Sequence, residues 1–269
     1  MTQVALSARQ AARSSTMDRL ARFGCTARAI VYLVIGWLGL QIALGNHPHQ
    51  ANQRGALAEI AQGDLGLALL WILGFGLGAY AVWRLSEAAV GSRADGAGKG
   101  ARAKSAARGL IYAGACVSTF AFIAGASRTS QSHEQVAFTA RVMRDSGGRW
   151  LVGAVGFVIV IVGVYLCAEG ITRRFERQLR MAEMAPRTRL VVSRLGMVGT
   201  IARGVVFAIA GILVIAAAVT FDPRKSSGLD GAMRTLAHQP YGPWLLAALA
   251  IGLIAFGAFG FAQARWVKT

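Results

Sequence analysis

Charge is scarce in the long apolar stretches of this 269-residue sequence. Only 15% of its residues are charged, 55% are hydrophobic, and the mean hydropathy is positive, which excludes an ordinary soluble domain. Away from their ends, the apolar stretches contain no Asp, Glu, Lys, Arg or His. Proton-coupled carriers and intramembrane enzymes usually need such groups, so this absence argues against both classes.

Cysteine and histidine are also rare. The cysteines are Cys25, Cys116 and Cys167. They have no paired spacing and no CxxC motif, so the sequence offers no disulfide framework. The histidines, all in predicted outer loops, are His47, His49, His133 and His238. They are weak candidates for a metal site, and ordinary loop histidines are the favoured interpretation because no ligand motif accompanies them. We therefore expect no cofactor and no catalytic residue.

Six apolar stretches are long enough to cross a bilayer, which takes about 20 helical residues. The predicted spans are 27–44, 66–82, 106–126, 150–168, 199–220 and 244–262. Their cytoplasmic side is predicted from charge, since 21 of the 29 Lys and Arg fall on the side of both termini and both long linkers. This asymmetry predicts a multi-pass protein of the bacterial inner (plasma) membrane with both termini in the cytoplasm. Anionic lipid headgroups are a sufficient partner for the surplus of positive charge, so nucleic acid is not expected.

A short phrase opens each odd-numbered span. It consists of Ala, Arg, a small residue, two aliphatic residues and an aromatic ring. Its arginines are Arg28, Arg108 and Arg203, and its rings are Tyr32, Tyr112 and Phe207. A second phrase closes each even-numbered span, with Gly, any residue, an aromatic ring and a polar residue four positions later. Its members are Gly78, Tyr80 and Arg84, then Gly163, Tyr165 and Glu169, then Gly257, Phe259 and Gln263.

The two phrases predict one two-helix unit used three times. The expected organisation is a mobile basic tail at 1–19, repeats at 20–90, 105–170 and 194–269, a flexible linker at 91–104 and a basic amphipathic linker at 171–193. Because each unit crosses twice, the copies should share one orientation and surround a pseudo-threefold axis normal to the membrane. The fold class is therefore all-α integral membrane. We also expect short outer-loop helices near 55–61 and 231–237, and the second linker could extend the fourth helix until Pro186.

With both phrases in view, the chain resembles the membrane family known as domain of unknown function 1206, whose members carry a two-helix repeat three times. The resemblance covers roughly Leu20 to Arg265, and the middle copy lacks the outer-loop pattern of the other two. It implies an architecture and no activity, so it supplies no catalytic residue.

The repeated arginines allow two interpretations. As interfacial anchors, Arg28, Arg108 and Arg203 would extend to the membrane surface from helix ends. Alternatively, they would form a ring around the axis that binds anionic headgroups or the acids of a partner protein. Arg84, Glu87 and Glu169 are predicted to form structural ion pairs, including a Glu169–Arg pair that joins one hairpin to the next; proton handling is the alternative.

Small and aromatic residues complete the set of candidates. Gly78, Gly163 and Gly257 suit tight helix packing, with a glycine-lined axis as the alternative. The rings of both phrases are candidates for the same positions. The leading hypothesis is a non-enzymatic module that organises lipids or a membrane or cytoplasmic partner through its basic inner face. The second is a passive channel or carrier for a small solute along the axis, and the third is an outer-face metal or redox enzyme.

Overall fold

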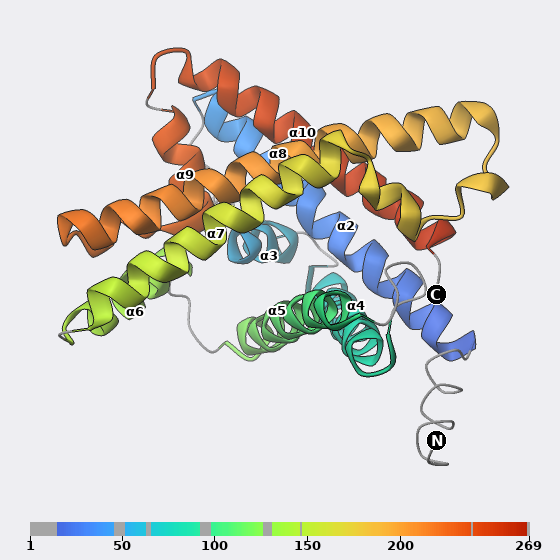
Figure 1. Ribbon diagram of the computed structural model, residues 1–269, viewed down its shortest axis with the longest axis horizontal. Coiled ribbons are helices and arrows are strands. Elements are labelled where there is room, and N and C mark those ends of the chain that lie inside the picture. Colours follow the sequence, from blue (N-terminus) through green and yellow to red (C-terminus); the bar gives the residue numbers. More distant parts are fainter. Residues whose placement is uncertain are drawn as a thin grey trace.

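The computed structural model describes residues 15–45, 52–62, 66–91, 98–125, 131–145, 147–237 and 239–267 (Figure 1). Within these ranges the regular structure is helical, apart from one isolated β-bridge between Leu179 and Val267. Six helices are long and apolar enough to span a membrane, as the sequence predicts. They are α2 (Ser15–Ala43), α4 (Gly66–Val90), α5 (Lys99–Ile123), α7 (Gly148–Ile171), α8 (Pro186–Thr220) and α10 (Gly242–Trp266).

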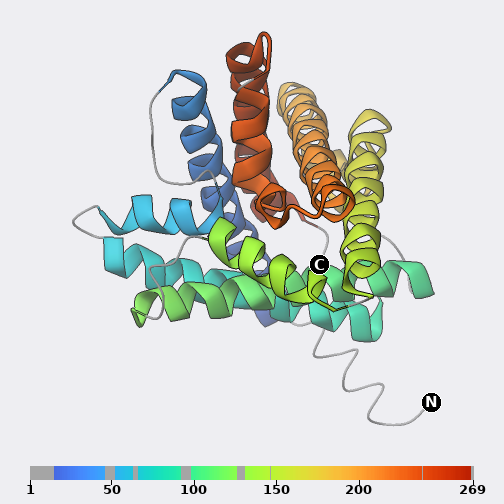
Figure 2. The same ribbon diagram turned by 90° about the vertical axis from the view of Figure 1, so that its left-hand side faces the viewer.

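The spanning helices pack most closely in three antiparallel pairs: α4 with α5, α7 with α8, and α10 with α2. Each pair joins the second span of one repeat to the first span of the next, and the last repeat returns to the first. Figure 2 shows the α4–α5 pair crossing the direction of the other four helices. The closest helix pairs therefore form between different hairpins and not within one hairpin.

Glycine permits the tightest of these pairings. A Cβ atom added to Gly163 on α7 would lie 2.6 Å from the backbone nitrogen of Ala208 on α8. A Cβ on Gly204 would lie 2.7 Å from the carbonyl oxygen of Gly163. Any larger side chain at either position would force the two backbones apart.

Helices of the same repeat pack unequally. Helices α2 and α4 pack together, as do α8 and α10, whereas α5 and α7 make few contacts within the described residues. Gly199 on α8 meets the backbone of Phe256 on α10, and Gly24 on α2 meets the backbone of Tyr80 on α4. The second repeat is therefore an open hairpin between two closed ones.

Short helices follow the first span of each repeat. They are α3 (Gln53–Ala61), α6 (Gln131–Met143) and α9 (Gly228–Ala237). Two of them confirm the short helices expected near 55–61 and 231–237, and α6 supplies a counterpart in the repeat whose pattern is divergent. Helix α3 is fixed at its start by Asn52, whose side chain accepts a hydrogen bond from the backbone N–H of Gly55.

The second linker differs from its prediction. Helix α7 ends at Ile171, and the chain turns at Arg173, which has φ 52°, into two 3-10 helices, η1 (Arg174–Gln178) and η2 (Met181–Glu183). The expected extension of the fourth helix to Pro186 is wrong. Pro186 instead begins α8, since the first turn of a helix needs no donor from it.

Apolar residues recur every four positions in this linker, at Ile171, Phe175 and Leu179, and the last two pack against α10. Phe175 and Leu179 are buried in a cluster with Phe256 and Phe259 of α10. The backbone N–H of Arg180 also donates to the carbonyl oxygen of Trp266. The linker is therefore held against the end of α10 instead of continuing α7.

The first linker is shorter than predicted. Helix α5 already begins at Lys99, within the range 91–104 that we expected to be flexible. The residues from Lys99 to Lys104 are Lys, Gly, Ala, Arg, Ala and Lys, and all but Gly100 favour helix, so they extend the apolar span.

Candidate anion-binding pocket

A cavity of about 460 Å³ lies among the spanning helices. Its walls come mainly from α2, α5, α7 and α8, with single residues from α4, α9 and α10 and two from the start of α3. Most of the wall is apolar, including Val31, Ile35, Leu77, Val206 and Leu253. The described residues that line it include four cations and no carboxylate: Arg28, Lys104, Arg108 and Arg203.

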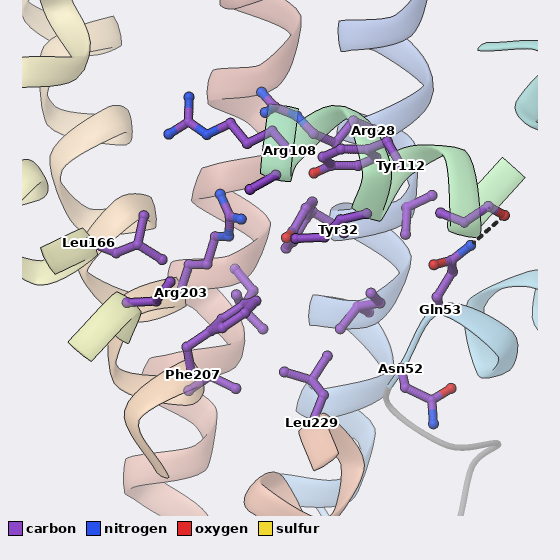
Figure 3. Close-up of a pocket in the computed structure, with 18 of the residues that line it drawn as sticks. Arg28, Tyr32, Asn52, Gln53, Arg108, Tyr112, Leu166, Arg203, Phe207 and Leu229 are labelled. Atoms are coloured by element: carbon purple, nitrogen blue, oxygen red, sulfur yellow. Dashed lines mark hydrogen bonds between the residues drawn. The ribbon is translucent and has the colours of Figure 1, made fainter. Parts of the chain in front are cut away.

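All three repeated arginines line this pocket together with all three rings of the opening phrase. Figure 3 shows Arg28 and Arg108 near one end and the guanidinium group of Arg203 pointing toward them from the middle of the pocket, whereas Phe207 and Leu229 lie toward the other end. Each ring stands four residues after its arginine, so both side chains leave their helix on the same face. The pocket therefore has a cationic end and an apolar end.

Arg28 is fixed by neutral partners. Its side chain is buried, with 6% of the residue exposed. Its Nη1 donates to the hydroxyl of Tyr80 over 2.9 Å, and its Nη2 donates to Oε1 of Gln263. Its Nε is buried without a hydrogen-bond partner, and the guanidinium lies 5.0 Å from the centre of the Tyr80 ring. The positive charge of Arg28 is thus held in place without being neutralised.

Arg203 is held by rings. Its guanidinium lies 5.5, 5.4 and 5.1 Å from the ring centres of Tyr32, Phe207 and Phe256, and its buried Nε lacks a hydrogen-bond partner. Within the part of the chain that the structure describes, no carboxylate forms an ion pair with Arg203 or Arg28. Such rings favour a cation but do not cancel its charge.

Arg108 shares one acid with Lys104. Lys104 Nζ lies 3.6 Å from Glu169 Oε1, and Arg108 Nη2 lies 3.8 Å from Glu169 Oε2. Lys104 also donates to the hydroxyl of Tyr165 over 2.9 Å. We refer to these four side chains as the α5–α7 latch, because they join the two helices at one end. The sequence predicts that Glu169 pairs with an arginine of the next hairpin. In the structure it pairs instead with Lys104 and Arg108 of its own hairpin.

The other predicted pair is local. Arg84 Nη1 donates to Glu87 Oε2 over 2.7 Å, its Nε donates to the Tyr80 hydroxyl over 3.1 Å, and both charged side chains are buried. With Gln263 in the corresponding place on α10, the three repeats present an arginine, a glutamate and a glutamine at one position. Among the residues that the structure describes, Glu169 is the carboxylate that forms ion pairs with the pocket cations.

The rings and the glycines of the closing phrase lie in different places. Tyr80 and Phe259 are buried, and Tyr165 is 41% exposed and lines the pocket. The glycines of the closing phrase, Gly78, Gly163 and Gly257, are absent from the pocket lining. They lie at helix contacts instead, where an added Cβ would meet Cys116 Sγ at 3.1 Å, Ala208 N at 2.6 Å and Leu33 Cγ at 2.7 Å, respectively.

The candidate metal residues are the four histidines between the predicted spans. His47, His49 and His238 lie outside the described residues, as does the side chain of His133. Among the residues that the structure describes, no group of three His, Cys, Asp or Glu side chains is arranged to hold a metal ion.

Lys104 is the main residue that the sequence interpretation missed. It stands four positions before Arg108, where the other repeats have Gly24 before Arg28 and Gly199 before Arg203. In both other repeats this glycine meets the backbone of the paired span, whereas Lys104 reaches across to Tyr165 and Glu169. A comparison of the three opening phrases extended by four residues would have revealed it.

The architecture defines a multi-pass helical membrane protein built from three related hairpins around a cationic pocket. Its sequence matches the family model described as Domain of Unknown Function (DUF1206) at residues 23–91, 103–173 and 198–267. The chain therefore belongs to that family, and the three matches confirm the triplicated repeat.

One relative extends the similarity to nearly the whole chain. "Uncharacterized protein YxxB" of Bacillus subtilis (strain 168) is 28% identical over 248 residues, which cover 90% of this chain and 88% of the relative. No solved structure matches the chain.

Proposed function

We propose that this protein is a non-enzymatic membrane module that binds an anionic amphiphile in its central pocket. The observation that carries this proposal is the excess of cations, in which Arg28 and Arg203 have no acidic partner among the described residues. An isolated charge within a membrane costs about 2.5–3.5 kcal/mol on insertion scales. A bound phosphate or carboxylate would offset this cost by accepting charge-assisted hydrogen bonds from the guanidinium groups.

The shape of the pocket supports a ligand with an apolar part. The guanidinium groups gather toward one end, and Val206, Phe207, Leu229 and Leu253 form much of the rest. A small inorganic anion would make no contact with these apolar side chains. A volume of about 460 Å³ suits a headgroup with the first part of its hydrocarbon chain.

A pseudo-threefold arrangement also forms part of this proposal. The cyclic order of the helix pairs supports it, as does the convergence of the equivalent arginines. The charge asymmetry of the sequence supports cytoplasmic termini in a plasma membrane. With that orientation, the cationic end of the pocket faces the cytoplasmic leaflet, where anionic lipids supply suitable headgroups.

A continuous channel has less support. Beyond the pocket, buried apolar side chains pack between α3, α9 and the spanning helices, including Leu57, Leu70, Met233 and Leu246. A solute path along the axis would have to displace this cluster. Binding in a pocket that ends at the cluster requires no such rearrangement.

The binding proposal is tested by removing charge at two places. In one variant, Arg28, Arg108 and Arg203 are replaced by Gln. In the matched control, called the linker control, the exposed residues Arg174 and Arg177 of η1 and Arg187 at the start of α8 are replaced by Gln. We expect the pocket variant to lose at least tenfold in affinity for phosphatidic acid in lipid nanodiscs, measured by native mass spectrometry. The linker control should keep its affinity, although both variants lose the same formal charge.

The single variant Arg203→Gln guards against a folding failure. Arg203 has no ion pair within the described residues, so its neutral form should be tolerated. The loss of one charge-assisted contact predicts an affinity about tenfold weaker. Equal phosphatidic acid binding by the wild type, the triple variant and Arg203→Gln would refute the proposed function.

A further inference from the structure

We propose that the ligand of the central pocket enters from the bilayer, between α5 and α7, and that its hydrocarbon tail remains in this opening. This inference rests on the proposed function and adds the source of the ligand and the route it follows. It therefore assigns the ligand to the phosphate-headed lipids rather than to soluble anions.

The exposed part of the pocket wall lies on two helices only. The exposed side chains among the described lining residues are Ala107 and Ile111 of α5 and Val162 and Tyr165 of α7. Ile111 is 67% exposed and Val162 is 41% exposed, although both line the cavity. Lining residues from the other helices are buried or half-buried. The pocket therefore opens to the outside between α5 and α7.

Polar contacts define both ends of the opening. At the end near the linkers, the α5–α7 latch joins Lys104 and Arg108 to Tyr165 and Glu169. At the other end, Gln53 of α3 donates to the carbonyl oxygen of Ala115 on α5 over 3.1 Å. Between these contacts, the border is formed by apolar side chains.

A groove continues from this opening. A second cavity of about 450 Å³ lies against α3, α5 and α6, and it shares Gln53, Ile111 and Ala115 with the central pocket. Gly114 and Phe138 also line it, and Phe138 is 67% exposed. The shared residues connect the two cavities along α5. The groove also holds the ion pair between Arg54 and Glu134, so a tail that leaves the pocket past Ile111 meets apolar side chains along only part of it.

The opening follows from one sequence difference. Gly24 and Gly199 permit close packing between the two spans of the first and third repeats. Lys104 takes that place in the second repeat and spans the distance to α7 with its long side chain. A charged residue where the others have glycine thus keeps one hairpin open, on the side where the spans meet lipid.

The latch also determines which headgroups suit the pocket. A phosphate near Arg108 and Lys104 would compete with Glu169 for the same two cations. Arg28 and Arg203 would supply further donors, so a phosphate monoester, with a charge of about −1.5 to −2 at pH 7, offsets more of the excess than a diester does. Neutral and zwitterionic lipids lack the net charge to offset it.

The test narrows the opening without altering the cations. In the portal variant Ile111→Trp/Val162→Trp, two large rings occupy the apolar border. In the matched control Leu110→Trp/Ile161→Trp, the same rings are added to neighbouring residues that are 66% and 51% exposed and do not line the pocket. Binding is measured in nanodiscs by the immobilised electron paramagnetic resonance signal of phosphatidic acid spin-labelled on its tail. A parallel calorimetric titration uses glycerol phosphate as a tail-free headgroup.

We expect the portal variant to lose at least tenfold in lipid affinity while the control matches the wild type. Portal-variant binding equal to wild type, together with loss in Arg203→Gln, would overturn the lateral route and leave the proposed function intact. Unchanged lipid binding in Arg203→Gln and in the triple arginine variant would overturn both. Glycerol phosphate binding as tight as that of the lipid would overturn the assignment to a bilayer lipid.

Discussion

The hairpins of the second and third repeats share the same sequence phrases but close in different ways. In the third repeat, Gly199 of α8 meets the backbone of Phe256, and the two helices pack directly. In the second repeat, Lys104 holds the equivalent place, and α5 and α7 are joined by charged and hydroxyl groups at one end. The comparison teaches that one residue of a repeated phrase can determine whether its unit contributes packing or an opening.

The largest predicted effect comes from breaking the closed hairpin. A Cβ at Gly199 would lie 2.5 Å from backbone atoms of Phe256, so Gly199→Leu should destabilise the protein by about 3 kcal/mol or more. The measurement is thermal unfolding in detergent. The matched control is Gly114→Leu on α5, where an added Cβ meets nothing within 4 Å. Equal losses at the two positions would contradict the packing difference.

The next prediction gives the open hairpin the residue of the closed ones. Lys104→Gly removes the side chain that reaches α7, and it should let the two helices approach and reduce phosphatidic acid binding about tenfold. Distances between spin labels at the C-terminal end of α5 and the N-terminal end of α7 report the approach. Lys99→Gly, which makes the same exchange earlier on α5, is the control. An unchanged distance distribution in Lys104→Gly would show that Lys104 does not keep the hairpin open.

Removing the carboxylate of Glu169, which Lys104 and Arg108 share, should change the affinity for phosphatidic acid less than Lys104→Gly does, and in the opposite direction. Glu169→Gln leaves Lys104 and Arg108 without their carboxylate, which should cost about 1–2 kcal/mol of stability. It also removes the competitor of the ligand, so phosphatidic acid should bind a few-fold more tightly. Unfolding and lipid titration of the same sample measure both effects. A variant with weaker lipid binding would assign Glu169 to the ligand site itself.

The smallest effect is expected in thiol reactivity. Cys25 is 2% exposed beside the closed first hairpin, whereas Cys116 of α5 and Cys167 of α7 are half-buried. Maleimide labelling in detergent, followed by mass spectrometry of the peptides, should modify Cys25 most slowly. Labelling of Cys25 as fast as the others would indicate that the first hairpin opens as readily as the second.

Much of the architecture follows from local sequence. Six apolar runs predict six spans, and the position of Arg203 four residues before Phe207 predicts that they share a helix face. This local rule also predicts that the three arginines occupy equivalent places. The sequence does not decide whether these arginines anchor the helices at the membrane surface or gather around an axis. Their meeting in one pocket depends on how the repeats pack together.

The rest depends on contacts between distant residues. The partners of Arg28, which are Tyr80 and Gln263, lie 52 and 235 residues away, so no local pattern identifies them. Ile171, Phe175 and Leu179 recur every four residues, which predicts a helix. In the structure, Phe175 and Leu179 are buried against α10 in a turned segment, whereas Ile171 is 66% exposed. The opening at α5 and α7 left a signal in the sequence, namely Lys104 in place of glycine, which only an alignment of the three repeats reveals.

The most direct test of the central claim is an electron cryo-microscopy map, at side-chain resolution, of the protein in nanodiscs that contain phosphatidic acid. Our account predicts headgroup density between Arg28, Arg108 and Arg203, with tail density leaving between Ile111 and Val162. A map in which α5 packs directly against α7 and the three arginines face an empty or protein-filled space would contradict it.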